Sequence, residues 1–268
     1  LNGAQRAFEH LLTLEESDSS PHFYLGHIAQ AKKEHELAIE HYIAVEDGPN
    51  VLQALTRAIA LLKNADDKAR VQQILSDARA SLPMQATQIF TIEAEWLNLH
   101  DYSDEAFTLI EDALSITPND TTLLYTRAMM IESTDFPQAE KDLRQVLALE
   151  PDNATVQNAL GYTLLLHTDR FNEAHQLIQS ALNTEPEDPA ILDSMGWVLH
   201  KMGRSHEALP YLEKAHGLYS DPEVSSHLIQ VYWATGHEEK AKSLLEAAHK
   251  DNPDNPFLDE AMQAINTQ

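Results

Sequence analysis

The chain repeats itself about every 34 residues, and this period constrains the fold more than any other feature. Three columns of similar residues run in phase through eight copies, with successive members 33 to 35 residues apart. The first column holds small residues: Leu11, Val45, Ala78, Ala113, Val146, Ala181, Ala215 and Ala248. The second holds bulky residues three positions earlier: Phe8, Tyr42, Leu75, Ile110, Leu143, Ile178, Leu212 and Leu245. The third is again small: Ala4, Ala38, Val71, Ala106, Ala139, Ala174, Ala208 and Ala241.

These columns have the spacing of one face of a helix, because residues three, four and seven positions apart lie on the same side. Small residues let a neighbouring helix approach, and the bulky residue fills the remaining space. A proline column follows the helices, at Pro83, Pro118, Pro151, Pro186 and Pro253. Proline ends a helix, and Asn119–Asp120 and Asp152–Asn153 can then cap the next one. Gly203 and Gly236 fit the turn between the two helices of a copy.

Several copies resemble one known family closely. The run Leu192-Asp193-Ser194-Met195-Gly196-Trp197-Val198-Leu199, followed by Gly203 and by Glu207-Ala208-Leu209, resembles a tetratricopeptide repeat (TPR). The run Asn158-Ala159-Leu160-Gly161-Tyr162 resembles a second copy, whereas the copies at 50–83 and 84–119 lack the glycine pair. The resemblance implies an all-α fold. It is a right-handed α-solenoid of antiparallel helix pairs, with about seven full repeats, an N-terminal half repeat and a C-terminal capping helix.

The period predicts where these repeats begin and end. Seven are expected, at 19–49, 50–83, 84–119, 120–153, 154–188, 189–222 and 223–255. Residues 256–268 are expected to form the capping helix that a solenoid needs on its last apolar face. Residues 1–18 match only the second helix of a repeat. We therefore expect the sequence to come from a longer protein and to begin inside a repeat array.

The net charge narrows the class of partner. Asp and Glu number 43 against 18 Lys and Arg, and the formal net charge is −25. Such a surface repels phosphate, so nucleic acid is excluded as a partner and a basic or neutral protein or peptide is favoured. The charge could also serve solubility alone. No stretch approaches the roughly 20 apolar residues that cross a membrane, so no direct membrane insertion is expected.

No motif points to catalysis, a cofactor or a metal. The chain has no cysteine, no phosphate-binding loop and no nucleophile motif. Three His-Glu pairs begin at His35, His206 and His237, but the second histidine of a zinc motif would fall at Ile39, Pro210 and Ala241. We expect no catalytic residue, no metal site and no cofactor, and hence a non-enzymatic protein.

In TPR proteins the first helix of each repeat lines a concave groove, and the resemblance carries this role to the matching positions. The expected groove residues are Phe23, His27, Gln30, Tyr125, Arg127, Asn158, Tyr162, Leu165, Asp193, Trp197, His200, Lys201, Gln230 and Trp233, with Ser226 beside them. Tyr162, Trp197 and Trp233 are expected to line up across three repeats. These aromatic residues could instead pack between repeats. If they bind a partner, alanine at Tyr162 and Trp197 should weaken binding and leave the melting temperature nearly unchanged.

The resemblance also suggests a role. Residues 188–212 are similar to the C-terminal half of large proteobacterial TPR lipoproteins, one of which activates a periplasmic carboxyl-terminal processing protease. This implies a scaffold that holds a protein or peptide in its groove, as an adaptor for such a protease or for envelope assembly. The protein would then be periplasmic and tethered to the outer membrane. The alternative location is the cytoplasm. A structural spacer or self-association module, including a homo-oligomer, and a regulatory domain of a larger protein are the alternatives.

Overall fold

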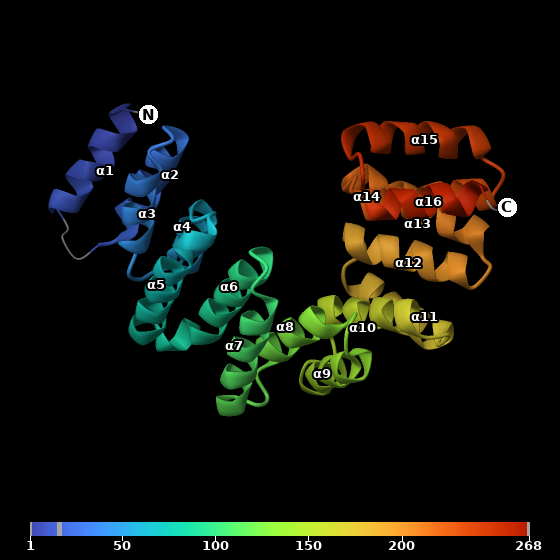
Figure 1. Ribbon diagram of the computed structural model, residues 1–268, viewed down its shortest axis with the longest axis horizontal. Helices are drawn as coiled ribbons and strands as arrows, with labels where there is room; N and C mark the ends of the chain where they lie inside the picture. The colour runs from blue at the N-terminus through green and yellow to red at the C-terminus, as the bar shows by residue number, and fades with distance from the viewer. Residues whose placement is uncertain (1, 15–17, 267–268) are drawn as a thin grey trace. The chain divides into compact units, whose positions relative to one another are not determined.

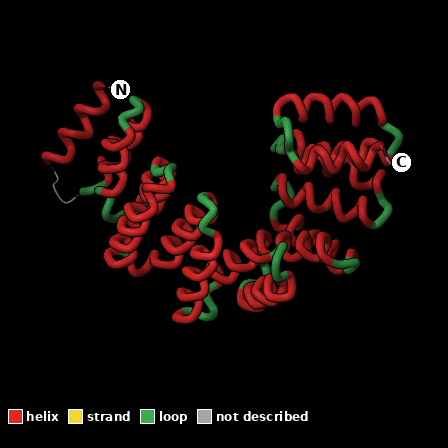
Figure 2. Tube along the Cα trace, viewed as in Figure 1, coloured by secondary structure: helices red, strands yellow, loops and turns green. Residues whose placement is uncertain are grey.

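The computed structural model describes residues 2–14 and 18–266 and contains only helices and loops within them (Figure 2). Over these residues there are sixteen α-helices, two short 3-10 helices and no strand, so the predicted all-α class is confirmed. The predicted end segments 1–18 and 256–268 include residues 1, 15–17 and 267–268, which lie outside the described part. None of the described helices is long and apolar enough to cross a membrane.

The chain divides into two compact units, Leu1–Met130 and Ile131–Gln268. The helices of the first unit are α1 (Asn2–Leu14), α2 (Ser20–Ala31), α3 (His35–Ile43), α4 (Val51–Leu61), η1 (Ala65–Asp67), α5 (Lys68–Ser81), η2 (Pro83–Gln85), α6 (Ala86–Leu99) and α7 (Ser103–Ile116), with α8 (Thr121–Ile131) at the boundary. The second unit contains α9 (Phe136–Leu149), α10 (Ala154–His167), α11 (Phe171–Thr184), α12 (Pro189–Lys201), α13 (Ser205–Leu218), α14 (Pro222–Ala234), α15 (Glu238–Asp251) and α16 (Pro256–Asn266).

Within each unit, most helices that follow one another in the chain pack together (Figure 1). In the first unit α4 packs on α3 and α6. In the second unit α10 packs on α11, α12 on α13 and α14 on α15, and each pair also contacts the pair that follows it. This is the stacking of a solenoid, in which each repeat buries its apolar face against its neighbours. The predicted solenoid of helix pairs is therefore confirmed.

The residue columns of the sequence meet inside these pairs. Gly196 in α12 faces Leu212 in α13, and a Cβ atom added to Gly196 would lie 2.4 Å from Leu212 Cγ. That distance is far below van der Waals contact, so only glycine allows α12 and α13 to come this close. Leu212 is fully buried, as are Ala208 and Ala215 of the two small columns.

The helix ends follow the predicted capping and turn residues. The side chain of Asn153 accepts a hydrogen bond from the Val156 amide at 3.1 Å, and that of Asp120 accepts one from the Leu123 amide at 3.0 Å. Each bond satisfies an amide that has no partner within its own helix. Gly203, in the turn between α12 and α13, has a φ of +77°, the left-handed conformation predicted there.

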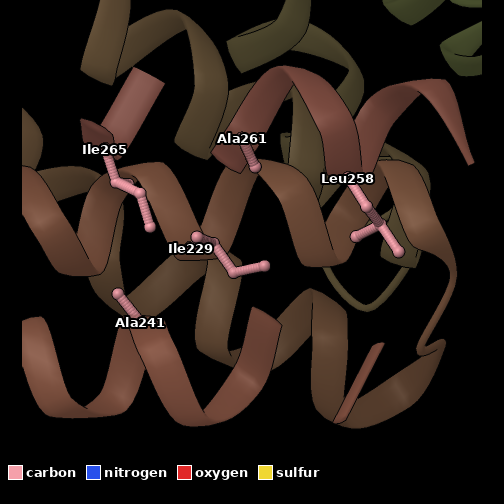
Figure 3. Packing of buried hydrophobic residues seen from close by; sticks show 5 residues of the cluster. All are labelled: Ile229, Ala241, Leu258, Ala261 and Ile265. Carbon is pink, nitrogen blue, oxygen red and sulfur yellow. The ribbon is translucent and has the colours of Figure 1, made fainter. Parts of the chain in front are cut away.

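The C-terminal helix α16 packs across α14 and α15 and covers their apolar surface (Figure 3). Leu258, Ala261 and Ile265 of α16 form one buried cluster with Ile229 of α14 and Ala241 of α15. Leu258 and Ala261 are fully buried. The cluster holds α16 in place beside the inner residues of α14, which belong to the site described next.

Candidate functional site

A cavity of about 600 Å³ opens in the second unit between α10, α12, α14 and α16. We call it the unit-2 cavity. Its lining comes from first helices of three successive helix pairs and from the C-terminal helix. The lining residues are Glu132 before α9, Tyr162, Leu165 and Leu166 of α10, Trp197 and Lys201 of α12, Glu223, Ser226, His227 and Gln230 of α14, and Phe257 and Glu260 of α16.

The centre of the wall is a stack of aromatic rings. The centroid of the Trp197 ring lies 4.0 Å from that of the His227 ring and 5.1 Å from that of the His200 ring. The Trp197 ring is nearly parallel to both. Lys201 Nζ lies 4.6 Å from the centroid of the Trp197 ring. Trp197 is only 3% exposed, so it is at once part of the cavity wall and part of the core.

A buried carboxylate orients His227. Its Nδ1 atom lies 2.9 Å from Asp193 Oδ2 and 3.0 Å from Oδ1, and both residues are about 5% exposed. Because a carboxylate can only accept, this contact assigns the proton to Nδ1. The pair joins α12 to α14 and fixes the ring that stacks on Trp197.

A second polar contact bridges α10 and α14. The Tyr162 hydroxyl donates a hydrogen bond of 2.5 Å to Glu223 Oε1, between residues 61 positions apart in the sequence. Burial, and then the bond to Glu223, raise the pKa of Tyr162 well above its usual value. Tyr162 therefore stays protonated and acts as a donor to Glu223 at every physiological pH.

The cavity wall is negatively charged. Glu132, Glu223 and Glu260 line it, and among its described lining residues Lys201 is the one permanent cation. Thr163 Oγ1 donates to Glu132 Oε2 at 3.3 Å and holds that carboxylate from α10. Such a wall favours an occupant that carries positive charge or hydrogen-bond donors.

The histidine on the far side of Trp197 is neutral. Burial, followed by the nearby positive charge of Lys201, lowers the pKa of His200 to about 4. His200 Nδ1 lies 3.0 Å from the Ser205 hydroxyl across the turn to α13. His200 thus packs against Trp197 as an uncharged aromatic ring.

The predicted groove residues of the second unit divide into two groups. Tyr162, Leu165, Trp197, Lys201, Gln230 and Ser226 line the unit-2 cavity. The others support that wall or lie beside it: Asp193 holds His227, His200 stacks on Trp197, Trp233 packs on the cluster under α16, and Asn158 is half-buried in α10. The three predicted aromatics therefore occupy two different environments.

The predicted groove residues of the first unit do not line this cavity. Phe23 is buried and packs edge-on against His27 at 4.6 Å between ring centroids, and Gln30 accepts a hydrogen bond from the Tyr42 hydroxyl at 2.7 Å. Tyr125 is half-buried, and Arg127 forms an ion pair with Glu111. Phe23, His27, Gln30 and Arg127 thus have partners inside the first unit.

Sequence reasoning missed several lining residues. Glu223 looks like an ordinary acidic residue in the first turn of a helix, and Phe257 and Glu260 belong to a helix expected only to cap the array. His227 carried one usable signal, because it follows its partner Asp193 by 34 residues, the length of one repeat. An acidic residue and a histidine one period apart occupy equivalent positions of successive repeats and can therefore pair between them.

Models of protein families support the prediction of repeated helix pairs in the second unit. Two models described as "Tetratricopeptide repeat" match residues 130–197 and 190–222. These ranges contain Tyr162, Trp197 and Lys201 of the cavity wall, while α14 and α16 lie beyond them except for Pro222.

Relatives and solved structures agree. The chain is 43% identical over 208 residues to "TPR repeat-containing protein PA4667" of Pseudomonas aeruginosa. The matched region covers 77% of this chain and 35% of that protein. The chain thus spans about a third of that relative's length. Among solved structures, a TPR protein of Parabacteroides merdae has a TM-score of 0.62 at 14% identity, covering 93% of this chain and 99% of its own. The protein TTC0263 of Thermus thermophilus has a TM-score of 0.58 at 21% identity, covering 68% and 100%.

Proposed function

We propose that this chain, a tetratricopeptide-repeat protein, is a scaffold that holds a segment of a partner protein in the unit-2 cavity. Tetratricopeptide repeats are generally protein-interaction modules and are generally not enzymes. The proposal adds a place of binding to this general role. It is supported by the lining, because three repeats and the C-terminal helix contribute side chains to one cavity.

The cavity combines the two kinds of surface that a bound segment needs. Leu166 and Phe257, which are 47% and 40% exposed, offer apolar area, and an aromatic side chain such as Phe257 gives contact area at little cost in conformational entropy. Gln230 and Glu223 offer polar groups that can orient the segment. A volume of about 600 Å³ lies within the range of roughly 300 to 1,000 Å³ that is usual for binding pockets.

The adaptor role is the finer part of the proposal. In this role the protein would present a periplasmic protease, or a component of envelope assembly, with a bound partner, and would act at the outer membrane. It is supported by the similarity of residues 188–212 to proteobacterial TPR lipoproteins. Fractionation of the cell that produces the intact protein tests this location, and recovery only from the cytosol would contradict it.

The binding site itself is tested by blocking the cavity. Leu166 lines it and is 47% exposed, so Leu166→Trp should fill its mouth without disturbing the core. Leu218 is 54% exposed on α13, outside the lining, and Leu218→Trp is the matched control. Affinity capture with the intact protein should recover the same partner with wild type and Leu218→Trp and lose it with Leu166→Trp. Equal recovery by all three proteins would overturn the proposed site.

A further inference from the structure

The buried histidine of the unit-2 cavity has one ring nitrogen without a partner. His227 is 5% exposed and lines the cavity, and its Nδ1 is taken by Asp193. Within residues 18–266, no hydrogen bond reaches its Nε2. In a neutral imidazole whose Nδ1 carries the proton, Nε2 is an acceptor. Nε2 is not among the fully enclosed unpaired atoms of the described residues, so it is reachable from the cavity and can accept a hydrogen bond from an occupant.

The carboxylates around the cavity also have accepting capacity left. Glu223 receives one bond at Oε1 from Tyr162. Glu132 receives one at Oε2 from Thr163, and its Oε1 lies 3.5 Å from His167 Nε2. A carboxylate offers about four acceptor positions, so both can take further donors. Glu260 adds a third carboxylate from the exposed side of α16. The polar groups of the wall are therefore all hydrogen-bond acceptors of the kind that bind a group rich in N–H donors.

The apolar part of the wall fits the stem of such a group. Lysine and arginine carry their charge on an aliphatic chain that packs well on apolar surface. Leu166 and Phe257, both well exposed, supply that surface beside the acids. The Trp197 ring already holds one cation, since Lys201 Nζ lies 4.6 Å from its centroid.

We propose that the partner inserts a lysine or arginine side chain into the unit-2 cavity, an inference that rests on the proposed function. Its cationic head donates to Glu223, Glu132 and His227 Nε2, and its stem packs on the apolar wall. The partner's bound segment is therefore basic, which agrees with the net charge of −25 on this chain. An acidic segment is excluded because it would place a carboxylate against three others.

Model peptides test the charge directly. The probes are fluorescein-labelled nine-residue peptides of glycine and serine whose central residue is lysine, arginine, norleucine or glutamate. Norleucine has an unbranched aliphatic side chain like the stem of lysine but no charge, so it separates charge from apolar burial. With the intact protein, fluorescence anisotropy should show the lysine and arginine peptides binding at least about tenfold tighter than the norleucine peptide, with the glutamate peptide weakest. Equal binding of the lysine and norleucine peptides would overturn the inference.

Two variants locate the effect. Glu223→Gln keeps an acceptor for the Tyr162 hydroxyl and removes the charge, and should weaken lysine-peptide binding about tenfold while leaving the norleucine peptide unchanged. Glu246→Gln removes a charge from the exposed face of α15 outside the cavity and should change neither. If Glu246→Gln weakens binding as much as Glu223→Gln, the peptides respond to the general charge of the protein and the inference is wrong.

The inference and the proposed function can fail separately. If Leu166→Trp abolishes partner capture but lysine and norleucine peptides bind alike, the cavity is a binding site and only its preference for basic residues is wrong. If Leu166→Trp leaves both partner capture and lysine-peptide binding unchanged, the cavity is not the binding site and both are wrong.

Discussion

Trp197 and His227 lie in the first helices of two successive helix pairs, and their rings stack with centroids 4.0 Å apart and an interplanar angle of 18°. His227 is held on its other side by Asp193 of α12, the helix that also carries Trp197. The contact thus locks the first helices of two successive pairs together at the wall of the cavity. Residues that shape the cavity are therefore also residues that hold the repeats in register.

This double role changes the expected effect of removing Trp197. Alanine at this 3%-exposed position should destabilise the protein by about 3–5 kcal/mol, because it empties a large buried volume. The unchanged melting temperature belongs to the interpretation of Trp197 as a groove residue only, and a loss of this size belongs to the alternative in which it packs between repeats. Urea unfolding followed by circular dichroism measures the loss. Trp197→Phe keeps an aromatic ring against His227 and should lose much less; an alanine variant as stable as wild type would show that the stack does not support the fold.

The close approach of α12 and α13 predicts a cost for a single methyl group. Gly196→Ala places a Cβ atom 2.4 Å from Leu212 Cγ and should destabilise the protein by about 1–3 kcal/mol. Gly217 of α13 is the matched control, since a Cβ atom there meets nothing within 4 Å. Gly217→Ala should be neutral or stabilise by up to about 1 kcal/mol, because alanine is the better helix former. Thermal unfolding of the two variants should therefore shift in opposite directions, and similar shifts would argue against the tight contact.

The buried pair of Asp193 and His227 should be strongly coupled. Asp193→Asn removes the charge that pairs with the imidazole Nδ1–H and should cost about 1–3 kcal/mol in the free energy of unfolding. His227→Gln should cost a similar amount, and the double variant should cost clearly less than the two together. A double-mutant cycle from urea titrations gives this coupling. Additive losses would mean that the two side chains do not interact in solution.

His200 makes stability depend on pH in a defined window. Its pKa falls from 6.5 to about 4 on folding, so the folded state binds fewer protons than the unfolded state between these values. Stability is therefore unaffected above about pH 6.5 and is lost as the pH falls toward 4, when the unfolded chain takes up the proton first. His200→Gln should flatten this part of the curve of unfolding free energy against pH.

Other histidines contribute to the same curve, so a control is needed. Burial also lowers the pKa of His22, His27, His41, His175 and His216, and some acid sensitivity should remain in the His200 variant. His206→Gln changes an exposed histidine of α13 and should leave the wild-type slope. An unchanged slope in His200→Gln would contradict the neutral, buried state of His200.

The repeat geometry could be predicted from sequence because it depends on local spacing. Gly196 faces Leu212 as Gly161 faces Ile178. A glycine therefore meets a residue of the bulky column in more than one copy, and packing requires the smaller residue to face the larger. Asn153 and Asp120 could be predicted as caps for the same reason, since a cap acts within one turn of its own helix.

The cavity could be predicted only in part. Tyr162 and Trp197 occupy equivalent positions in adjacent copies, so the period places both on one wall. The bond between Tyr162 and Glu223 depends instead on the rotation between helix pairs that are not adjacent, which the period does not give. Phe257 and Glu260 belong to α16, which begins 34 residues after α14 and so takes the place of the first helix of a further copy. The sequence interpretation treated this helix only as a cap and did not extend the groove to it.

The central claim, that a partner segment lies in the unit-2 cavity, is tested most directly by site-specific photocrosslinking. A benzophenone amino acid replaces Phe257, which lines the cavity and is 40% exposed, or Leu218, which lies outside it. Mass spectrometry of the irradiated complex of the intact protein with its captured partner then locates the adduct. We predict an adduct from position 257 to one partner segment that contains lysine or arginine, and none from position 218. Crosslinking from position 218 alone, or none from 257 while the partner stays bound, would contradict the account.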